Sequence, residues 1–309
     1  NGSAANVHTV IDHAQVNHDT NFTVTISGTS AAAADLKAID AITSGIITAT
    51  GVETITGSLS DVGDVVDVDT NKGNAGQQID IDTDFNVTLS DTGTMSASAL
   101  NTLNGKVPGT VTVTNAVTLT GSASDIATAA SADNAGTLAL ASNFGATVST
   151  GAVDAADLIT IYGQTSATIN ATGVTAINGT ATAVATAINH AQVNHDADFT
   201  VTLSEAAATG LELTQIDAAT NQVVDGLLVT TISGTASQVA AAAVAHAVYI
   251  AMSCAVVVGV AIAATPIAAC TVAVVPVAAA AVAAGTTADP TSLLRLHLPW
   301  MGQTMVDRL

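Results

Sequence analysis

The residues best suited to chemistry lie in an acidic run at residues 64–85, DVVDVDTNKGNAGQQIDIDTDF. Residues 67–73 of this run have the spacing D-x-D-x-N-x-G. Alternating side-chain oxygens on a tight turn, with a glycine that permits the bend, suit a hard cation such as Ca²⁺. The candidate calcium ligands are Asp67, Asp69, Asn71, Asp80 and Asp82, with Asp84 as a further choice. The glycine is one place late for a helix–loop–helix calcium hand and no Glu follows, so a solvated acidic loop is the alternative.

A second candidate is the phrase HAQVNHD, which begins at His13 and again at His190. Each copy holds two histidines five residues apart, at His13 and His18 and at His190 and His195. Histidines that bind zinc are usually three to five residues apart, so this spacing permits a zinc site. Neither copy has a strong third ligand beyond the Asp that follows. We therefore favour a role on the surface or in packing between repeats.

Motifs for catalysis are missing from the rest of the chain. We find no G-x-S-x-G motif, no phosphate-binding loop and no dinucleotide fingerprint, and no His is placed as a base for the many Ser residues. Cys254 and Cys270 could form a disulfide in a secreted protein. The sequence predicts that the protein is not an enzyme.

The element that must position these residues is a repeat. Short apolar strand phrases such as TVTISG and VTLTGS recur about 29 residues apart, a fixed period that is typical of a solenoid. In a solenoid each unit buries its apolar side against its neighbours. We expect the central apolar residues of these phrases to point inward and to stack in columns: Ile26, Ile55, Leu89, Leu119, Val148, Ile177, Leu203 and Ile232.

Two kinds of unit alternate. In the first kind the strand leads into a short predicted helix with apolar residues three apart, as at Leu36 and Ile39, behind small or capping residues. In the second kind the strand ends in Gly and a Ser or Thr caps the helix, as in GSASDIATAA at residues 121–130. A further extended segment, such as VTVTN at 111–115, follows the helix. The fold class expected is therefore α/β and β-rich, a solenoid of strand–short helix–strand units.

A longer repeat overlies the short one. Residues 1–27 match residues 178–204 at 18 of 27 positions, and the second copy lies three pairs of units further along the chain. Asn1 falls inside a unit, just after its strand, and no initiator Met or signal peptide precedes it. From this we expect the chain to be a piece of something longer.

Charge and composition limit the classes of partner that the chain can bind. The chain holds 25 acidic against five basic residues, a formal net charge of −20. This balance argues against nucleic acid and anionic membrane surfaces, both of which require a basic patch. Aromatic residues make up 2% of the chain, too few for a bulky core. Thin layers of Val, Ile and Ala suit stacked units better. The acidic repeats fit a secreted protein in a salty medium, or simply a soluble acidic surface.

The composition changes near residue 244, which divides the chain into a repeat region, 1–244, and an apolar C-terminal segment, 245–309. Residues 226–288 contain no Asp, Glu, Lys or Arg. Three interpretations stay open. The segment is a cap on the solenoid, or it contains a membrane or export hairpin within 248–285. In the third interpretation it is not the biological sequence, because residues 293–309 resemble the product of a shifted reading frame. In the first interpretation it also serves in assembly.

The phrases at 87–129 and 232–242 resemble the long "beta strand repeat" surface proteins of cyanobacteria and other aquatic bacteria, and the resemblance extends over residues 1–244. It implies secretion, display at the cell surface and a structural or adhesive role, sometimes with calcium. We expect an extracellular filament or surface layer whose subunits bind one another head to tail. The alternative is a calcium-dependent adhesin or ligand-binding module, with cell-surface polysaccharide as a partner.

Overall fold

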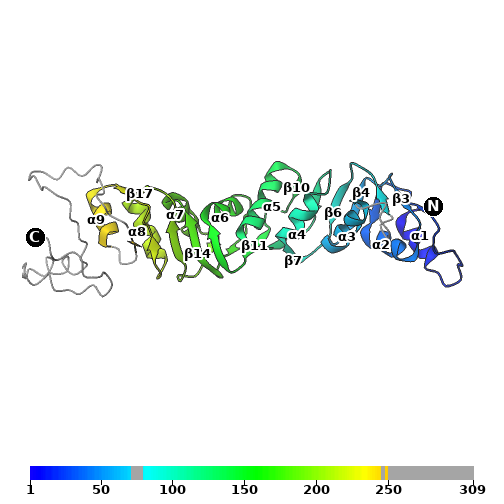
Figure 1. The fold of residues 1–309 in the computed structure, drawn as a ribbon, viewed down its shortest axis with the longest axis horizontal. Coiled ribbons are helices and arrows are strands. Elements are labelled where there is room, and N and C mark those ends of the chain that lie inside the picture. The colour runs from blue at the N-terminus through cyan, green and yellow to red at the C-terminus, as the bar shows by residue number, and fades with distance from the viewer. Residues whose placement is uncertain (71–78, 245–247, 250–309) are drawn as a thin grey trace, which may run out of the picture. The chain divides into compact units, whose positions relative to one another are not determined.

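The computed structural model describes residues 1–70, 79–244 and 248–249, which all lie within one compact unit, Asn1–Ala261. Over these residues the protein is a mixed α/β fold in which short helices alternate with short parallel strands (Figure 1). The helices are α1 (Ala4–Ile11), α2 (Ala33–Ile42), α3 (Leu59–Thr70), α4 (Ala97–Asn104), α5 (Ala123–Ala135), α6 (Ala155–Tyr162), α7 (Ala181–Ile188), α8 (Gly210–Ala219) and α9 (Ala236–Val244).

The strands between the helices are short. They are β1 (Val24–Thr25), β2 (Ser30–Ala32), β3 (Ile47–Ala49), β4 (Thr54–Gly57), β5 (Ile79–Ile81), β6 (Asn86–Leu89), β7 (Gly93–Ser96), β8 (Val111–Val113), β9 (Val117–Gly121), β10 (Leu138–Ala139), β11 (Gly145–Val148), β12 (Gly151–Asp154), β13 (Ile169–Asn170), β14 (Val174–Gly179), β15 (Val193–Asn194), β16 (Thr200–Leu203), β17 (Ala207–Thr209), β18 (Val224–Asp225), β19 (Thr231–Ser233) and β20 (Val248–Tyr249).

All the strand pairs of the described residues are parallel. Three sheets have five strands each, in the orders β10-β8-β6-β4-β2, β15-β13-β11-β9-β7 and β12-β14-β16-β18-β20. Shorter sheets, β1-β3-β5 and β17-β19, lie at the two ends of the series. Each five-stranded sheet therefore takes strands from five successive turns of the chain.

The strands and the helices repeat with different periods. Facing residues in neighbouring strands are usually 23 or 24 apart in sequence, as for Ala31 and Ile55. The interval is longer across α3, between Ile55 and Val87, and across α5. The starts of the helices instead alternate between a shorter interval, as from α2 to α3, and a longer one, as from α3 to α4. The alternation of two kinds of unit is thus confirmed for the described helices.

The longer helix intervals after α3, α5 and α7 hold an extra strand. Three strands lie between α3 and α4, between α5 and α6, and between α7 and α8, whereas two lie in each of the shorter intervals. The third strand begins a new sheet, as β7 and β12 do. A helix is about 10 Å wide and parallel strands are about 4.8 Å apart, so successive helices do not fit over one sheet alone. The change of sheet relieves this mismatch.

The expected core residues are buried, all eight of them from Ile26 to Ile232. Their stacking in columns is wrong, because none of the eight faces another in the sheet register. Leu89, for example, faces Gly57 on one side and Val113 on the other. The reason is the difference in period, since the anchors follow the longer average spacing of the helices, whereas the sheets mostly pair residues 23 or 24 apart.

Several helices begin as their sequences predict, whereas α2 has Ala32 at its N-cap and no side-chain cap. In the first kind of unit Ser96 and Asp154 accept hydrogen bonds from backbone N–H groups of the first helical turn. In the second kind Ser122 and Thr180 do the same, and a glycine with positive φ precedes each of them. At Gly179 φ is +148°, and a Cβ would lie 3.3 Å from the Cβ of Ala155. Glycine thus supplies both the conformation and the space for this junction.

Candidate functional site

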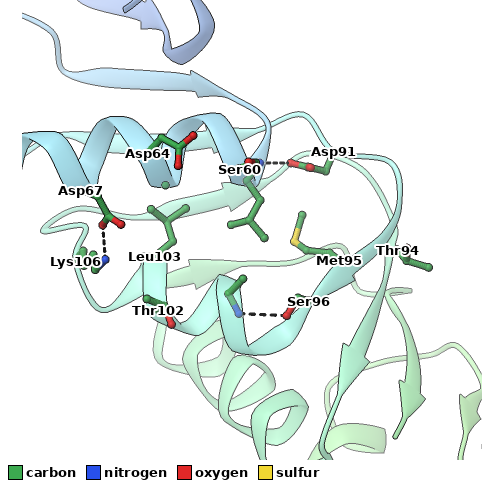
Figure 2. Close-up of a pocket in the computed structure, with 13 residues that line it drawn as sticks. Ser60, Asp64, Asp67, Asp91, Thr94, Met95, Ser96, Thr102, Leu103 and Lys106 are labelled. Carbon is green, nitrogen blue, oxygen red and sulfur yellow. Dashed lines mark hydrogen bonds and ion pairs between the residues drawn. The ribbon is translucent and has the colours of Figure 1, made fainter. Parts of the chain in front are cut away.

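A cavity with a volume of about 580 Å³ lies between α3 and α4 (Figure 2). Helix α3 contributes Asp64 and Asp67, and the segment from Asp91 through α4 contributes hydroxyl groups and apolar side chains, including Met95 and Leu103. The cavity lies at the longest interval between the starts of successive helices, from Leu59 to Ala97. Its volume is within the range of small-molecule sites.

The carboxylates around this cavity are paired. Lys37 from α2 contacts Asp61 and Asp64 at 2.7 Å each, and Lys106 contacts Asp67. The Lys37 ammonium, together with the Ser58 hydroxyl, holds the pKa of Asp61 below its usual value. Hydrogen bonds from Lys37 to these carboxylates likewise raise the pKa of Lys37. Helix α3 is thus held between lysines of its two neighbouring helical units.

A carboxylate from the following unit caps α3. Asp91 accepts a hydrogen bond of 2.7 Å from the backbone N–H of Leu59, at the start of the helix. The same device recurs at α7, where Glu205 accepts from the N–H of Ala181. Acids at helix N-termini accept hydrogen bonds from free N–H groups and interact favourably with the positive end of the helix dipole. Asp91 therefore has a structural role beside the cavity.

The walls of the cavity offer polar groups. They include carboxylates, the Lys106 ammonium and the hydroxyls of Thr94, Ser96 and Thr102. The arrangement suits a polar ligand held by hydrogen bonds and charge.

The predicted calcium residues do not form the expected tight turn at its beginning. Asp67 and Asp69 lie in α3, which continues to Thr70. The helix continues because Val62, Val65 and Val66 form a buried stripe at helical spacing. The oxygen spacing at 67–73 predicts a turn, but the helix extends through Asp67 and Asp69.

The other predicted ligands lie in or after β5 or outside the described residues. Asn71 and Gly73 belong to residues 71–78, which are not described. Asp80 lies in β5, and Asp82 follows it and accepts a hydrogen bond from the N–H of Thr83 at 2.7 Å. Among the described residues there is no cluster of three or more His, Cys, Asp or Glu side chains placed for a metal ion.

The second histidine of each HAQVNHD phrase anchors the chain. His195 Nε2 lies 3.0 Å from the carbonyl oxygen of Ile188, and its ring packs edge-on against Phe199. His18 makes the equivalent contacts with the carbonyl of Ile11, at 3.1 Å, and with the ring of Phe22. Each histidine ties the end of its helix to the strand that follows. These contacts lie within one unit, so the second histidines have a packing role there and not between repeats.

The two copies differ on the side that faces the preceding unit. In α7, Ala187 is 0% exposed, and Val193 in β15 is 7% exposed where it faces Ile169 of β13. The equivalent residues of the first copy, Val10 and Val16, are 56% and 41% exposed. We call the surface formed by Val10, His13, Gln15 and Val16 the N-terminal face.

Polar contacts on this side differ in the same way. Gln192 donates to the carbonyls of Thr165 and Ala167 at 2.8 and 3.1 Å, and the ring of His190 stacks on Tyr162 with centroids 3.7 Å apart. Over the described residues, no element packs against the side chains of Gln15 and His13 in this way, and both are exposed.

Comparisons with known proteins give no relative: no family model, curated protein or solved structure matches the chain. Within the described part of the chain, none of the helices has the length and apolar character to cross a membrane. The predicted hairpin at 248–285, apart from Val248–Tyr249, and the cysteines Cys254 and Cys270 lie outside the described residues.

Proposed function

We propose that this chain is a secreted structural protein, not an enzyme, whose repeat region is a solenoid and whose copies assemble head to tail into an extracellular filament or surface layer. The observation that carries the proposal is the stacking of the units. Along the described residues each helix packs against the next one, and the strands of successive units pair in parallel.

The way the units contact one another supports head-to-tail growth. Each described helix packs against the next, and the sheets pair strands in parallel. A further unit added at either end would continue the same contacts in the same direction. Such a heterologous contact does not close on itself and so propagates as a fibre. The apolar segment 245–309 of one copy is the proposed contact with the next copy.

The composition supports a structural role outside the cell. A repeat fold stabilised by neighbouring units suits an assembly that extends in one dimension. The net charge of −20 makes the chain a poor ligand for nucleic acid. The resemblance to bacterial and cyanobacterial surface repeats is the argument for secretion and self-association.

Electron microscopy of the native material, together with sedimentation of the purified chain, tests the proposal. We expect long fibres or sheets of uniform width from the full chain. A chain that lacks residues 245–309 should give short soluble species with the repeats still folded. Normal polymers from the truncated chain, or a full chain that stays monomeric at high concentration, would refute the proposal.

A calcium-dependent adhesin or ligand-binding module is the second candidate, and the acid-lined cavity between α3 and α4 favours it. Cell-surface polysaccharide, with many hydroxyl groups, suits the hydroxyls and carboxylates of the lining. If Ca²⁺ binds within residues 67–82, chelation should lower the melting temperature, since binding to the folded state alone stabilises it. Asp69→Ala should then remove the sensitivity. A melt that does not respond to chelator would exclude the calcium site.

A further inference from the structure

The cavity between α3 and α4 is open at a place where the equivalent pair of helices, α7 and α8, is joined by a hydrogen bond. The two pairs can be aligned on the residues that cap the second helix, Ser96 for α4 and Thr209 for α8. Three residues after its cap, α8 has Glu212, which accepts a hydrogen bond of 2.7 Å from Thr182 of α7. Helix α4 has Ala99 at this position, and Ala99 is exposed.

Helix α3 is also small on the side that lines the cavity. Gly63 lies five residues after Ser58, which caps α3, and a Cβ placed on Gly63 would contact no atom of a neighbouring element within 4 Å. The equivalent residues of α5 and α7 are Ala127 and Ala185, and each is only 6% exposed. Gly63 and Ala99 thus leave open the space that the wide interval between α3 and α4 creates.

The lining of this space combines hydroxyl groups with apolar side chains. Ser60, Thr94 and Thr102 supply hydroxyl groups, and Met95 and Leu103 lie between the two helices (Figure 2). Binding sites for small molecules commonly pair an apolar surface with a few polar groups that fix the orientation of the ligand. A sugar ring matches both parts, because its hydroxyl groups donate and accept hydrogen bonds and its C–H groups pack on apolar side chains.

The charges of the lining favour a ligand without charge. Asp64 contacts Lys37 at 2.7 Å and Asp67 contacts Lys106, while Asp91 caps α3. A cationic ligand would have to compete with these lysines for the carboxylates. An anionic ligand would be repelled by the carboxylates and by a chain of net charge −20. A hydroxyl group can donate to a carboxylate that keeps its lysine, since each carboxylate accepts several hydrogen bonds.

We propose that the cavity between α3 and α4 binds uncharged sugar units of a polysaccharide, in the space between Gly63 and Ala99. The sugar hydroxyls donate to Asp64 and accept from Thr102, and the ring packs on Met95. The inference rests on the second candidate function, a ligand-binding module, and names its site and the class of sugar.

A glycan array tests the class of sugar. The purified full chain is applied to neutral hexose and N-acetylhexosamine oligosaccharides, with oligosaccharides of uronic acids beside them. We expect binding to neutral oligosaccharides and none to the uronic acids, which carry the same sign of charge as the chain. Equal binding to the uronic acids would show that the class of sugar is wrong.

Side chains that fill the cavity test the site. Ala99→Glu introduces the residue type that α8 has at Glu212, and Gly63→Leu fills the same space without charge. Each should lower the affinity for the best neutral oligosaccharide about tenfold or more in isothermal titration calorimetry. Ser98→Glu is the matched control, because Ser98 is exposed on α4 outside the lining of the cavity, and it should leave the affinity unchanged. Thermal melts should show all three variants folded.

The possible outcomes separate this inference from the function on which it rests. A chain that binds an oligosaccharide equally well with and without the two filling substitutions would overturn the inference and leave the ligand-binding module standing. A wild-type chain that binds none of the oligosaccharides on the array would overturn both.

Discussion

The two copies of the long repeat, residues 1–27 and 178–204, have nearly the same sequence in different surroundings. Their helices, caps and anchoring histidines agree, since Ser3 and Thr180 each cap a helix and His18 and His195 make matching contacts. Their preceding neighbours differ. The comparison teaches that local sequence determines the shape of a unit, whereas burial and strand formation depend on the adjoining unit.

The missing strand shows this most clearly. Val193–Asn194 is strand β15 because β13 lies beside it, and the same residue types at 16–17 have no strand partner among the described residues. A strand exists through its pairing, while a short capped helix can form from its own residues and the sheet beneath it. The following predictions test how far this difference extends.

The largest difference should appear at Ala187 and Val10, which occupy the same place in the two copies. Ala187→Asp should destabilise the monomer by about 3–5 kcal/mol, because it buries a charge without a partner. Val10→Asp should change the free energy of unfolding by less than about 0.5 kcal/mol. Urea denaturation below the assembly concentration measures both. Equal effects would break the comparison.

A smaller difference in stability is expected between substitutions of Gln192 and of Gln15. Gln192→Ala should cost about 1–2 kcal/mol, since it removes donors to the carbonyls of Thr165 and Ala167. Gln15→Ala in the first copy should be nearly neutral in the monomer. Thermal melts of the two variants are the check, and a costly Gln15→Ala would show that the first copy already has a partner.

The histidines should behave alike, in contrast to the glutamines. His18→Ala and His195→Ala should each cost about 1 kcal/mol, because each loses one hydrogen bond to a helix-end carbonyl and an aromatic contact. Denaturant titration of both variants sharpens the comparison. If one change were neutral and the other costly, the shared anchoring role would be wrong.

The free energy of unfolding should depend on pH through Glu212, which lies at the junction between α7 and α8. Burial raises the pKa of Glu212, but hydrogen bonds from Thr182 and Thr209 outweigh it and leave the pKa below its usual value. A depressed pKa gives stability that is present above the ordinary Glu value and lost as the pH falls through the folded-state pKa. Glu212→Gln should thus destabilise by less than about 1 kcal/mol at pH 7. The difference should shrink in pH-dependent melts as the pH falls below the ordinary Glu value, and a deficit that does not change with pH would contradict this origin.

Much of the unit could be predicted from the sequence. The inward Leu36 and Ile39, the caps at Ser122 and Thr180 and the extended segment at 111–113 all follow from spacing and residue type. These features depend on residues close together along the chain. The alternation of two kinds of unit was visible for the same reason.

The sheet register and the cavity could not be predicted in this way. Register depends on which distant strands meet. The eight expected core residues are spaced more widely than the 23 or 24 residues that separate paired positions, so their spacing did not predict the register. The cavity arises where the longest helix interval separates α3 from α4, a packing property that no local motif carries. The spacing of the acids at 67–73 predicts a turn, whereas the buried valines of α3 belong to a helix that continues to Thr70.

Hydrogen–deuterium exchange of the purified chain tests the central claim most directly. It compares the amides of residues 10–17 with those of residues 187–194. We expect 187–194 to be protected, because an adjoining unit pairs with this segment, and 10–17 to exchange quickly. Equal protection of the two segments would contradict the account.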